Sequence, residues 1–194
     1  GKKYDYAVSA PVGNVQKEKY AFVYDTAKAQ ITGQAKTYND KYDKFIREPF
    51  YASFKAGEFD FTLMTIHILY GENAADRTGE MKEIADVYTF MQGRDEKEND
   101  VILTGDFNTE PGHSNFEYVK QIPTVKFAIT KGKSTLGESG NLYDNIIFDS
   151  GTQEYTNSKG IYLFDEVMGL STDKAQEMVS DHRPVYAVFC TGED

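Results

Sequence analysis

The 194-residue sequence has no tryptophan and only one cysteine, and acidic residues outnumber basic ones. The lone Cys190 excludes an intrachain disulfide and a zinc site built from a Cys/His cluster. No apolar run approaches the ~20 residues that a membrane-spanning helix needs. The net charge of −10 argues against a passive nucleic-acid binder, since contacts to phosphate dominate such binding. It does not exclude an enzyme, because clustered carboxylates can bind a divalent cation that reverses the local field.

The composition is that of a folded globular domain. Hydrophobic residues make up 40% of the sequence and charged residues 27%, which separates it from disordered chains. The sequence shows no internal repeat, low-complexity tract or linker. Residues 1–194 are therefore interpreted as one domain, long enough to bury a sizeable core.

Several short aromatic and β-branched runs predict strands. Residues 20–24 (YAFVY) and 50–54 have this composition, and the second run follows the turn-forming Glu48-Pro49. The run at 59–70 (FDFTLMTIHILY) is apolar on both faces, which is typical of a strand covered on both sides. Later strands are predicted at 143–148, around 161–164, and at 185–189.

A helix is predicted between two of these strands. Residues 76–93 carry apolar side chains at helical spacing, and Gly93 ends the pattern. Residues 101–103 begin the next strand. A strand, a helix and a strand in this order favour a crossover connection and a parallel pair. The sequence thus predicts an α/β fold with two packed mixed β-sheets and helices outside them.

Carboxylates and histidines gather where the predicted strands end or begin. These positions favour functional sites, because loops converge there on a rigid rim. His67 lies near the end of the long apolar run. The motifs TGDFN, YDN and SDHRPV supply the remaining polar side chains: Asp106 and Asn108, Asp144 and Asn145, and Asp181 and His182.

Each of these residues, taken alone, also has a structural explanation. A histidine at a strand end is more often a hydrogen-bonded structural residue than a catalyst. Asp106 and Asp181 can cap turns, and Arg183-Pro184 can set an extended entry to the last strand. His113, in the polar loop EPGHSN, is interpreted as a surface residue. As a set, however, two histidines and several acids outline an acid/base pair with a metal site.

The order and spacing of these motifs carry a resemblance. The strand-borne histidine, GDFN, YDNI and SDHRPV resemble the deoxyribonuclease I-like endonuclease/exonuclease/phosphatase family. Upstream, SAPVGNVQKEKYAFVY and FIREPFYASF resemble segments that carry a glutamate and a phosphate-contacting arginine in that family. The resemblance runs from about Tyr6 to the C-terminus, and it implies a four-layer α/β/β/α sandwich.

The resemblance implies two histidines that are each oriented by an acid. His182 would be a general acid or base, with Asp144 fixing its tautomer and raising its basicity. His67 would be the second histidine near the scissile phosphate, oriented by Glu18.

The resemblance also implies a metal and a phosphate site. Asp106 and Asn108 would position the attacking water, the phosphate and a metal, and Asp181 would be a metal ligand or its neighbour. Arg47 would contact a substrate phosphate through its fork of donors. The expected metal is Mg²⁺, with Mn²⁺ or Ca²⁺ as alternatives, because the donors are oxygens.

One part of the family pattern has no counterpart here. The family opens with a strand carrying an asparagine and a later strand ending in a metal-binding glutamate, and neither precedes Tyr4. We therefore expect a fold that is incomplete at the N-terminus, impaired activity of this chain, and an open apolar edge that a second copy can cover. The compartment is left open, a secreted or periplasmic location included.

The substrate follows by elimination. YDNI lacks the Trp-Cys-Asp-Arg pattern of inositol-polyphosphate phosphatases, and no tryptophan is present to act as in exonuclease III-like repair enzymes. The expected reaction is endonucleolytic hydrolysis of DNA, without a membrane partner. The alternatives are phosphatase or sphingomyelinase activity, or a non-catalytic member that uses the fold for binding.

Overall fold

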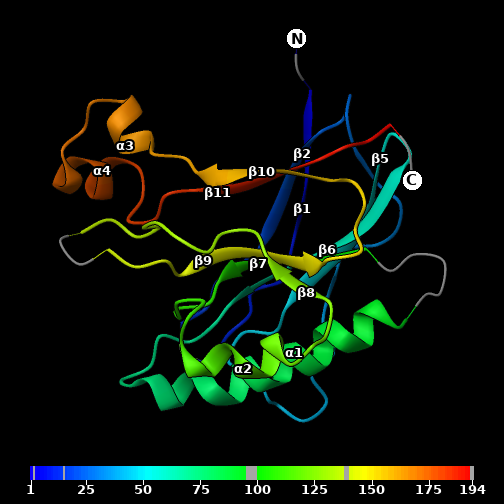
Figure 1. The fold of residues 1–194 in the computed structure, drawn as a ribbon, viewed down its shortest axis with the longest axis horizontal. Coiled ribbons are helices and arrows are strands. Elements are labelled where there is room, and N and C mark those ends of the chain that lie inside the picture. The colour runs from blue at the N-terminus through cyan, green and yellow to red at the C-terminus, as the bar shows by residue number, and fades with distance from the viewer. Residues whose placement is uncertain (2, 15, 95–99, 138–139, 193–194) are drawn as a thin grey trace.

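The computed structural model describes residues 1, 3–14, 16–94, 100–137 and 140–192. Its centre is a mixed seven-stranded sheet of order β3-β5-β6-β7-β9-β8, with β4 also pairing with β5 (Figure 1). The strands of this sheet are β3 (Gln30–Ile31), β4 (Lys36–Thr37), β5 (Phe50–Ala56), β6 (Phe59–His67), β7 (Val101–Asp106), β8 (Val125–Phe127) and β9 (Asp144–Asp149).

Helices cover one face of this sheet (Figure 1). The longest is α1 (Thr78–Gln92), preceded by the 3-10 turn η1 (Ala74–Arg77); η2 (Ser114–Phe116) and α2 (Glu117–Lys120) lie beside it. The apolar stripe of α1 is buried against β6 and β7, which confirms the predicted helix. The core between these layers includes Met64, Ile66, Met81, Ile84, Val87, Tyr88, Met91, Leu103 and Ile147.

The other face carries a second β layer made of two separate two-stranded antiparallel sheets. One pairs β1 (Tyr4–Val8) with β2 (Ala21–Asp25), and the other pairs β10 (Tyr155–Ile161) with β11 (Val185–Phe189). The short helices α3 (Phe164–Val167) and α4 (Thr172–Met178) lie at one end of β10 and β11 (Figure 1). The expected packing of two β layers flanked by helices is thus confirmed.

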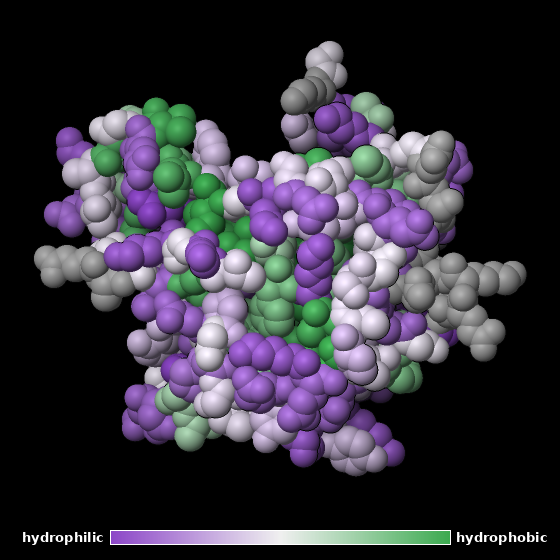
Figure 2. Space-filling view, viewed as in Figure 1, coloured by the Kyte–Doolittle hydropathy of each residue, from purple (hydrophilic) through white to green (hydrophobic). Residues whose placement is uncertain are grey.

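An apolar groove separates the two halves of the second layer. It consists of two hollows of about 350 and 280 Å³ that share Phe61, Leu63 and Thr104 as their floor. β2 forms the wall of the first hollow, and Ala187 and Phe189 of β11 line the second. Figure 2 shows hydrophobic residues in the middle of the surface turned to the viewer, framed by hydrophilic residues.

Most predicted strands appear, with altered ends. β6 and β7 pair in parallel from Thr62 opposite Val101 to His67 opposite Asp106, as the strand-helix-strand pattern predicts. The strand predicted at 59–70 stops at His67. The strand predicted around 161–164 is wrong in its placement: β10 ends at Ile161, and Phe164 begins α3. β10 is largely exposed and polar, so its sequence lacks the apolar alternation that marks a half-buried strand.

A buried carboxylate joins α1 to two loops near the ends of β5 and β6. Glu80, in the first turn of α1, is 4% exposed. Its Oε1 accepts a hydrogen bond from the Ile46 amide at 2.9 Å, and its Oε2 accepts one from the Leu69 amide at 2.8 Å. Two backbone amides in partly buried hydrogen bonds therefore depend on this one side chain, since an unpaired donor is costly away from water.

Replacing Glu80 by alanine should lower the free energy of unfolding by about 2–3 kcal/mol, because both amides lose their acceptor. Denaturant unfolding followed by circular dichroism measures the change. Asp86→Ala is the matched control, since Asp86 is an exposed acid on the same helix and should shift stability by less than about 0.5 kcal/mol. Equal effects of the two substitutions would contradict this role.

The apolar groove also makes self-association of the chain testable. If a second copy covers the groove, sedimentation velocity should show a dimer whose fraction rises with concentration. Leu63→Lys on the groove floor should abolish it, because a charge cannot be buried there without a partner. Val167→Lys on the exposed surface of α3 is the control. A monomer at every concentration would refute the prediction.

Candidate active site

Three neighbouring strands of the large sheet deliver the polar side chains to one place. The parallel register of β6 and β7 sets His67 opposite Asp106. β9 runs antiparallel to β7 and begins there, with Asp144 opposite Asp106. His182 joins them from the segment before β11, where it forms an isolated β-bridge with Thr135. Residues far apart in the sequence therefore meet at one edge of the sheet.

Gly105 allows β6 and β7 to come together at this point. Its φ of 151° is one that side-chain-bearing residues rarely adopt, and a Cβ there would lie 1.9 Å from the Ile66 carbonyl oxygen. No other residue fits without displacing the backbone of β6. The glycine of the GDFN motif is thus needed for the register that places Asp106 beside His67.

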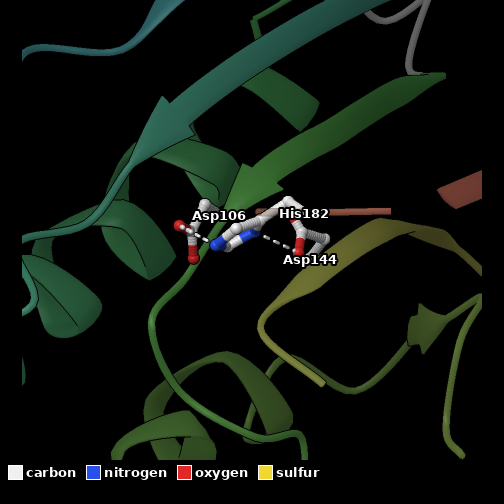
Figure 3. A group of neighbouring side chains, drawn as sticks. All are labelled: Asp106, Asp144 and His182. Atoms are coloured by element: carbon white, nitrogen blue, oxygen red, sulfur yellow. Dashed lines mark hydrogen bonds and ion pairs between the residues drawn. The ribbon is translucent and has the colours of Figure 1, made fainter. Parts of the chain in front are cut away.

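His182 and Asp144 form the first acid–histidine pair. Nδ1 of His182 lies 2.8 Å from Oδ2 of Asp144, as expected from the sequence (Figure 3). Asp144 is held in turn by its amide, which donates to Oγ of Ser134 at 3.1 Å. The pKa of His182 is raised to about 9, first by the hydrogen bond to Asp144 and then by the negative charges around it. At neutral pH the metal-free site therefore holds an imidazolium.

His67 and Glu18 form the second pair. Nδ1 of His67 lies 2.8 Å from Oε2 of Glu18, which confirms the expected contact. The His67 amide donates to the hydroxyl of Tyr20 at 2.9 Å. Arg47 lies behind the pair: it is 3.1 Å from Oε1 of Glu18 and also donates to the His67 carbonyl oxygen at 3.1 Å. Both the ring and the backbone of His67 are thus fixed from the second β layer.

Both histidines direct their other ring nitrogen toward one carboxylate oxygen. Oδ2 of Asp106 lies 3.5 Å from Nε2 of His67 and 3.9 Å from Nε2 of His182. Oδ1 of Asp106 accepts a hydrogen bond from the Asn108 amide at 2.8 Å. Burial raises the pKa of Asp106, and the nearby charge of Asp144 acts in the same direction. A positive charge near Asp106 would therefore stabilise the ionised form of its carboxylate.

These side chains line a cavity of about 620 Å³. His67, Asp106, Asn108, Asp144, Asp181 and His182 all face it, together with Tyr70, Thr135, Leu136, Gly140, Asn141, Tyr143 and Ser180. The structure therefore brings six of the eight predicted site residues to one cavity. Glu18 acts on it through His67, and Arg47 is buried at 6% exposure and paired with Glu18. The individual chemical roles stay predictions.

The donor set fits a hard divalent cation. Among the described residues, ligand atoms of Asp106, Asp144 and His182 lie within 4.8 Å of one another. Two half-buried carboxylates this close repel each other, and a cation between them would remove that cost. Asp181 is exposed at the rim and does not belong to this group, although its charge acts on His182.

Several positioning residues escaped the sequence analysis. Tyr20 was interpreted only as part of an apolar strand, although a buried tyrosine hydroxyl usually finds a partner. Ser134, whose Oγ accepts from the amides of Tyr143 and Asp144, lies in a loop without a motif. Glu80 looks like any helical acid until its backbone partners are known. His113 is exposed, as predicted, and accepts from the Asn115 amide at a helix start.

Known proteins are similar to this chain in sequence and in fold. A deoxyribonuclease of Thioalkalivibrio sp. is 35% identical over 189 residues, which cover 91% of this chain and 52% of that protein. Rat deoxyribonuclease gamma is 31% identical, covering 94% of this chain and 62% of that protein. The chain thus spans between half and two thirds of the length of these curated relatives. No family model matches the sequence.

The fold is that of solved members of one family. A protein of the endonuclease/exonuclease/phosphatase family from Bacteroides thetaiotaomicron superposes with a TM-score of 0.60 at 16% identity, covering 95% of this chain and 74% of that one. The deoxyribonuclease relatives and this shared fold agree with the paired histidines and acids described above. The chain therefore belongs to the deoxyribonuclease I-like endonuclease/exonuclease/phosphatase family.

Proposed function

We propose that this chain carries the catalytic site of a metal-dependent phosphodiester hydrolase that cleaves DNA internally. The observation that carries the proposal is that Nε2 of His67 and Nε2 of His182 both lie near Oδ2 of Asp106, while each histidine is held by its own acid. Hydrolysis of a phosphodiester needs one group to accept a proton from water and one to donate a proton to the leaving oxygen. Two oriented imidazoles supply that pair.

His182 suits the role of proton donor. With a pKa raised to about 9 it is protonated at neutral pH, and its Nε2–H points into the cavity because Nδ1 is bound to Asp144. There it can protonate the leaving oxygen or stabilise negative charge on the phosphate. Asp144 keeps the ring in this orientation throughout, since it bonds the nitrogen that does not react.

His67 suits the role of proton acceptor. Glu18 bonds its Nδ1, which leaves Nε2 in the cavity beside Asp106. The attacking water would lie between that nitrogen and the Asp106 carboxylate, so that its proton passes to His67 as the oxygen approaches phosphorus. Asn108 fixes Asp106 through its amide, while its own side chain donates to the Ile68 carbonyl at 2.8 Å.

A divalent cation, with Mg²⁺ first and Mn²⁺ or Ca²⁺ as alternatives, would be held by Asp106 with Asp144 and Asp181 nearby. When bound it would neutralise charge on the phosphate oxygens. We expect weak metal affinity and low activity from these residues alone, because a hard cation held by few carboxylates keeps its waters. Assaying the chain beside the Thioalkalivibrio relative tests this, and equal specific activity would overturn it.

The proposal predicts the effect of removing each imidazole. His182→Ala and His67→Ala should each lower the rate of supercoiled plasmid nicking by about 10²- to 10⁴-fold, the usual contribution of a positioned acid or base. A chelator should abolish nicking, and Mg²⁺ should restore it. The matched control is His113→Ala, because His113 is exposed and does not line the cavity.

Different failures of this experiment have different meanings. Nicking that survives both histidine substitutions would refute the assigned roles. Nicking that is insensitive to chelator would refute the metal requirement. Hydrolysis of a phosphorylated sugar or lipid without any DNA cleavage would move the function to a phosphatase or sphingomyelinase. Metal-dependent DNA binding without hydrolysis would favour the non-catalytic alternative.

The His182–Asp144 pair predicts a pH-dependent contribution to stability. Because the folded-state pKa of His182 is raised from 6.5 to about 9, its protonation stabilises the fold fully below 6.5, and this contribution is lost as the pH rises through about 9. In metal-free protein, His182→Asn should therefore lower the melting temperature at about pH 6 but much less at about pH 10.

Thermal melts of both proteins across this pH range, with chelator present, measure the difference. His113→Asn serves as the control and should show no such trend, since His113 has no acidic partner among the described ion pairs. A gap between wild type and His182→Asn that stays constant with pH would show that the pair does not couple protonation to folding.

A further inference from the structure

An exposed aromatic side chain lies in the catalytic cavity without a part in the proposed chemistry. Tyr70 is 59% exposed although it lines the same cavity as both histidines and Asp106. Its ring centroid lies 6.4 Å from that of Tyr143, at an interplanar angle of 58°, and Tyr143 also lines the cavity. An aromatic ring left open to water beside a polar site provides a flat surface for another ring.

An arginine supports this tyrosine from outside the cavity. The guanidinium carbon of Arg77 lies 5.3 Å from the centroid of the Tyr70 ring, within the range of a cation–π contact. Arg77 also donates a hydrogen bond to the Tyr70 carbonyl oxygen. Its Nε is buried and has no hydrogen-bond partner among the described residues. Arg77 thus holds the tyrosine at two points and places positive charge beside an otherwise acidic cavity.

The loop that carries Tyr70 is fixed before any ligand arrives. On one side, the Leu69 amide donates to the buried Glu80. On the other side, Gly71 has a φ of 67°, where a Cβ would lie 2.6 Å from Asp76. Asp76 itself accepts hydrogen bonds from the amides of Glu72 and Asn73 at 2.8 and 3.1 Å. The ring is therefore presented by a rigid turn, which lowers the entropy lost on binding.

We propose that Tyr70, supported by Arg77 and Tyr143, is a stacking subsite for a nucleobase next to the scissile phosphate. The inference rests on the proposed function and names its substrate class more closely. A base can stack on Tyr70 only when it is free of its own neighbours, so the subsite favours single-stranded or locally unpaired DNA over intact duplex. Stacking on an aromatic side chain needs no particular base, because every base presents a π face.

The test measures binding of fluorescently labelled oligonucleotides by anisotropy, with Mg²⁺ present. One probe is a short single-stranded thymidine oligomer, and the other has the same length and backbone but carries abasic tetrahydrofuran residues. The wild type should bind the thymidine oligomer about 10- to 100-fold more tightly, the range expected for one stacked base. Tyr70→Leu should bring the two affinities together, whereas Tyr70→Phe should keep most of the difference.

Tyr162→Leu is the matched control, because Tyr162 is 50% exposed but does not line the cavity. Equal affinity of the wild type for both probes, or an equal loss for both in Tyr70→Leu, would overturn the subsite. The same holds if neither probe binds. Base-dependent binding that vanishes in Tyr70→Leu, in a protein that never nicks DNA, would sustain the subsite while refuting the proposed hydrolysis.

Discussion

The close parallel pairing of β6 with β7 is the constraint on which the site depends. It sets His67 beside Asp106, and β9 then brings Asp144 to the same edge. The pairing needs Gly105, since any side chain there would collide with the backbone of β6. Once these three strands are in register, Asp144 lies 2.8 Å from Nδ1 of His182. The geometry of the acids and histidines is thus a property of the sheet more than of the loops.

The acids of the cavity repel one another, and a protonated histidine offsets part of that repulsion. Three acids face one cavity, Asp106 and Asp144 from two neighbouring strands and Asp181 from the segment before β11, in a chain whose net charge is already −10. His182 offsets part of this repulsion by holding a proton well above its ordinary pKa. The remaining negative charge favours the binding of a cation between Asp106 and Asp144.

The sequence predicts strands and motif residues well where their signals are local. β11 was predicted at its observed ends, Val185–Phe189, because a compact β-branched and aromatic run follows a proline. β10 was misplaced because an exposed polar strand carries no alternation. The acids and histidines were found because each stands at the end or start of a strand.

What the sequence could not show is the network that positions them. Glu80, Ser134 and Tyr20 act through backbone amides of residues far away in the chain. Such contacts leave no periodicity and no motif, since a backbone amide is the same at every residue. The groove in the second β layer also cannot be predicted from the sequence. The apolar residues on its floor have the same composition as a buried core, and only the arrangement of the second layer leaves them uncovered.

The two histidines of the cavity are held by different parts of the molecule. His67 takes its orientation from Glu18 and Tyr20, which belong to the β1–β2 side of the second layer, whereas His182 takes its orientation from Asp144 on the large sheet. A disturbance that separates the two β layers would therefore release His67 from its partners and leave the His182–Asp144 pair in place. The orientation of His67 can therefore be lost without global unfolding, to a degree set by how firmly the β1–β2 hairpin is held against the sheet.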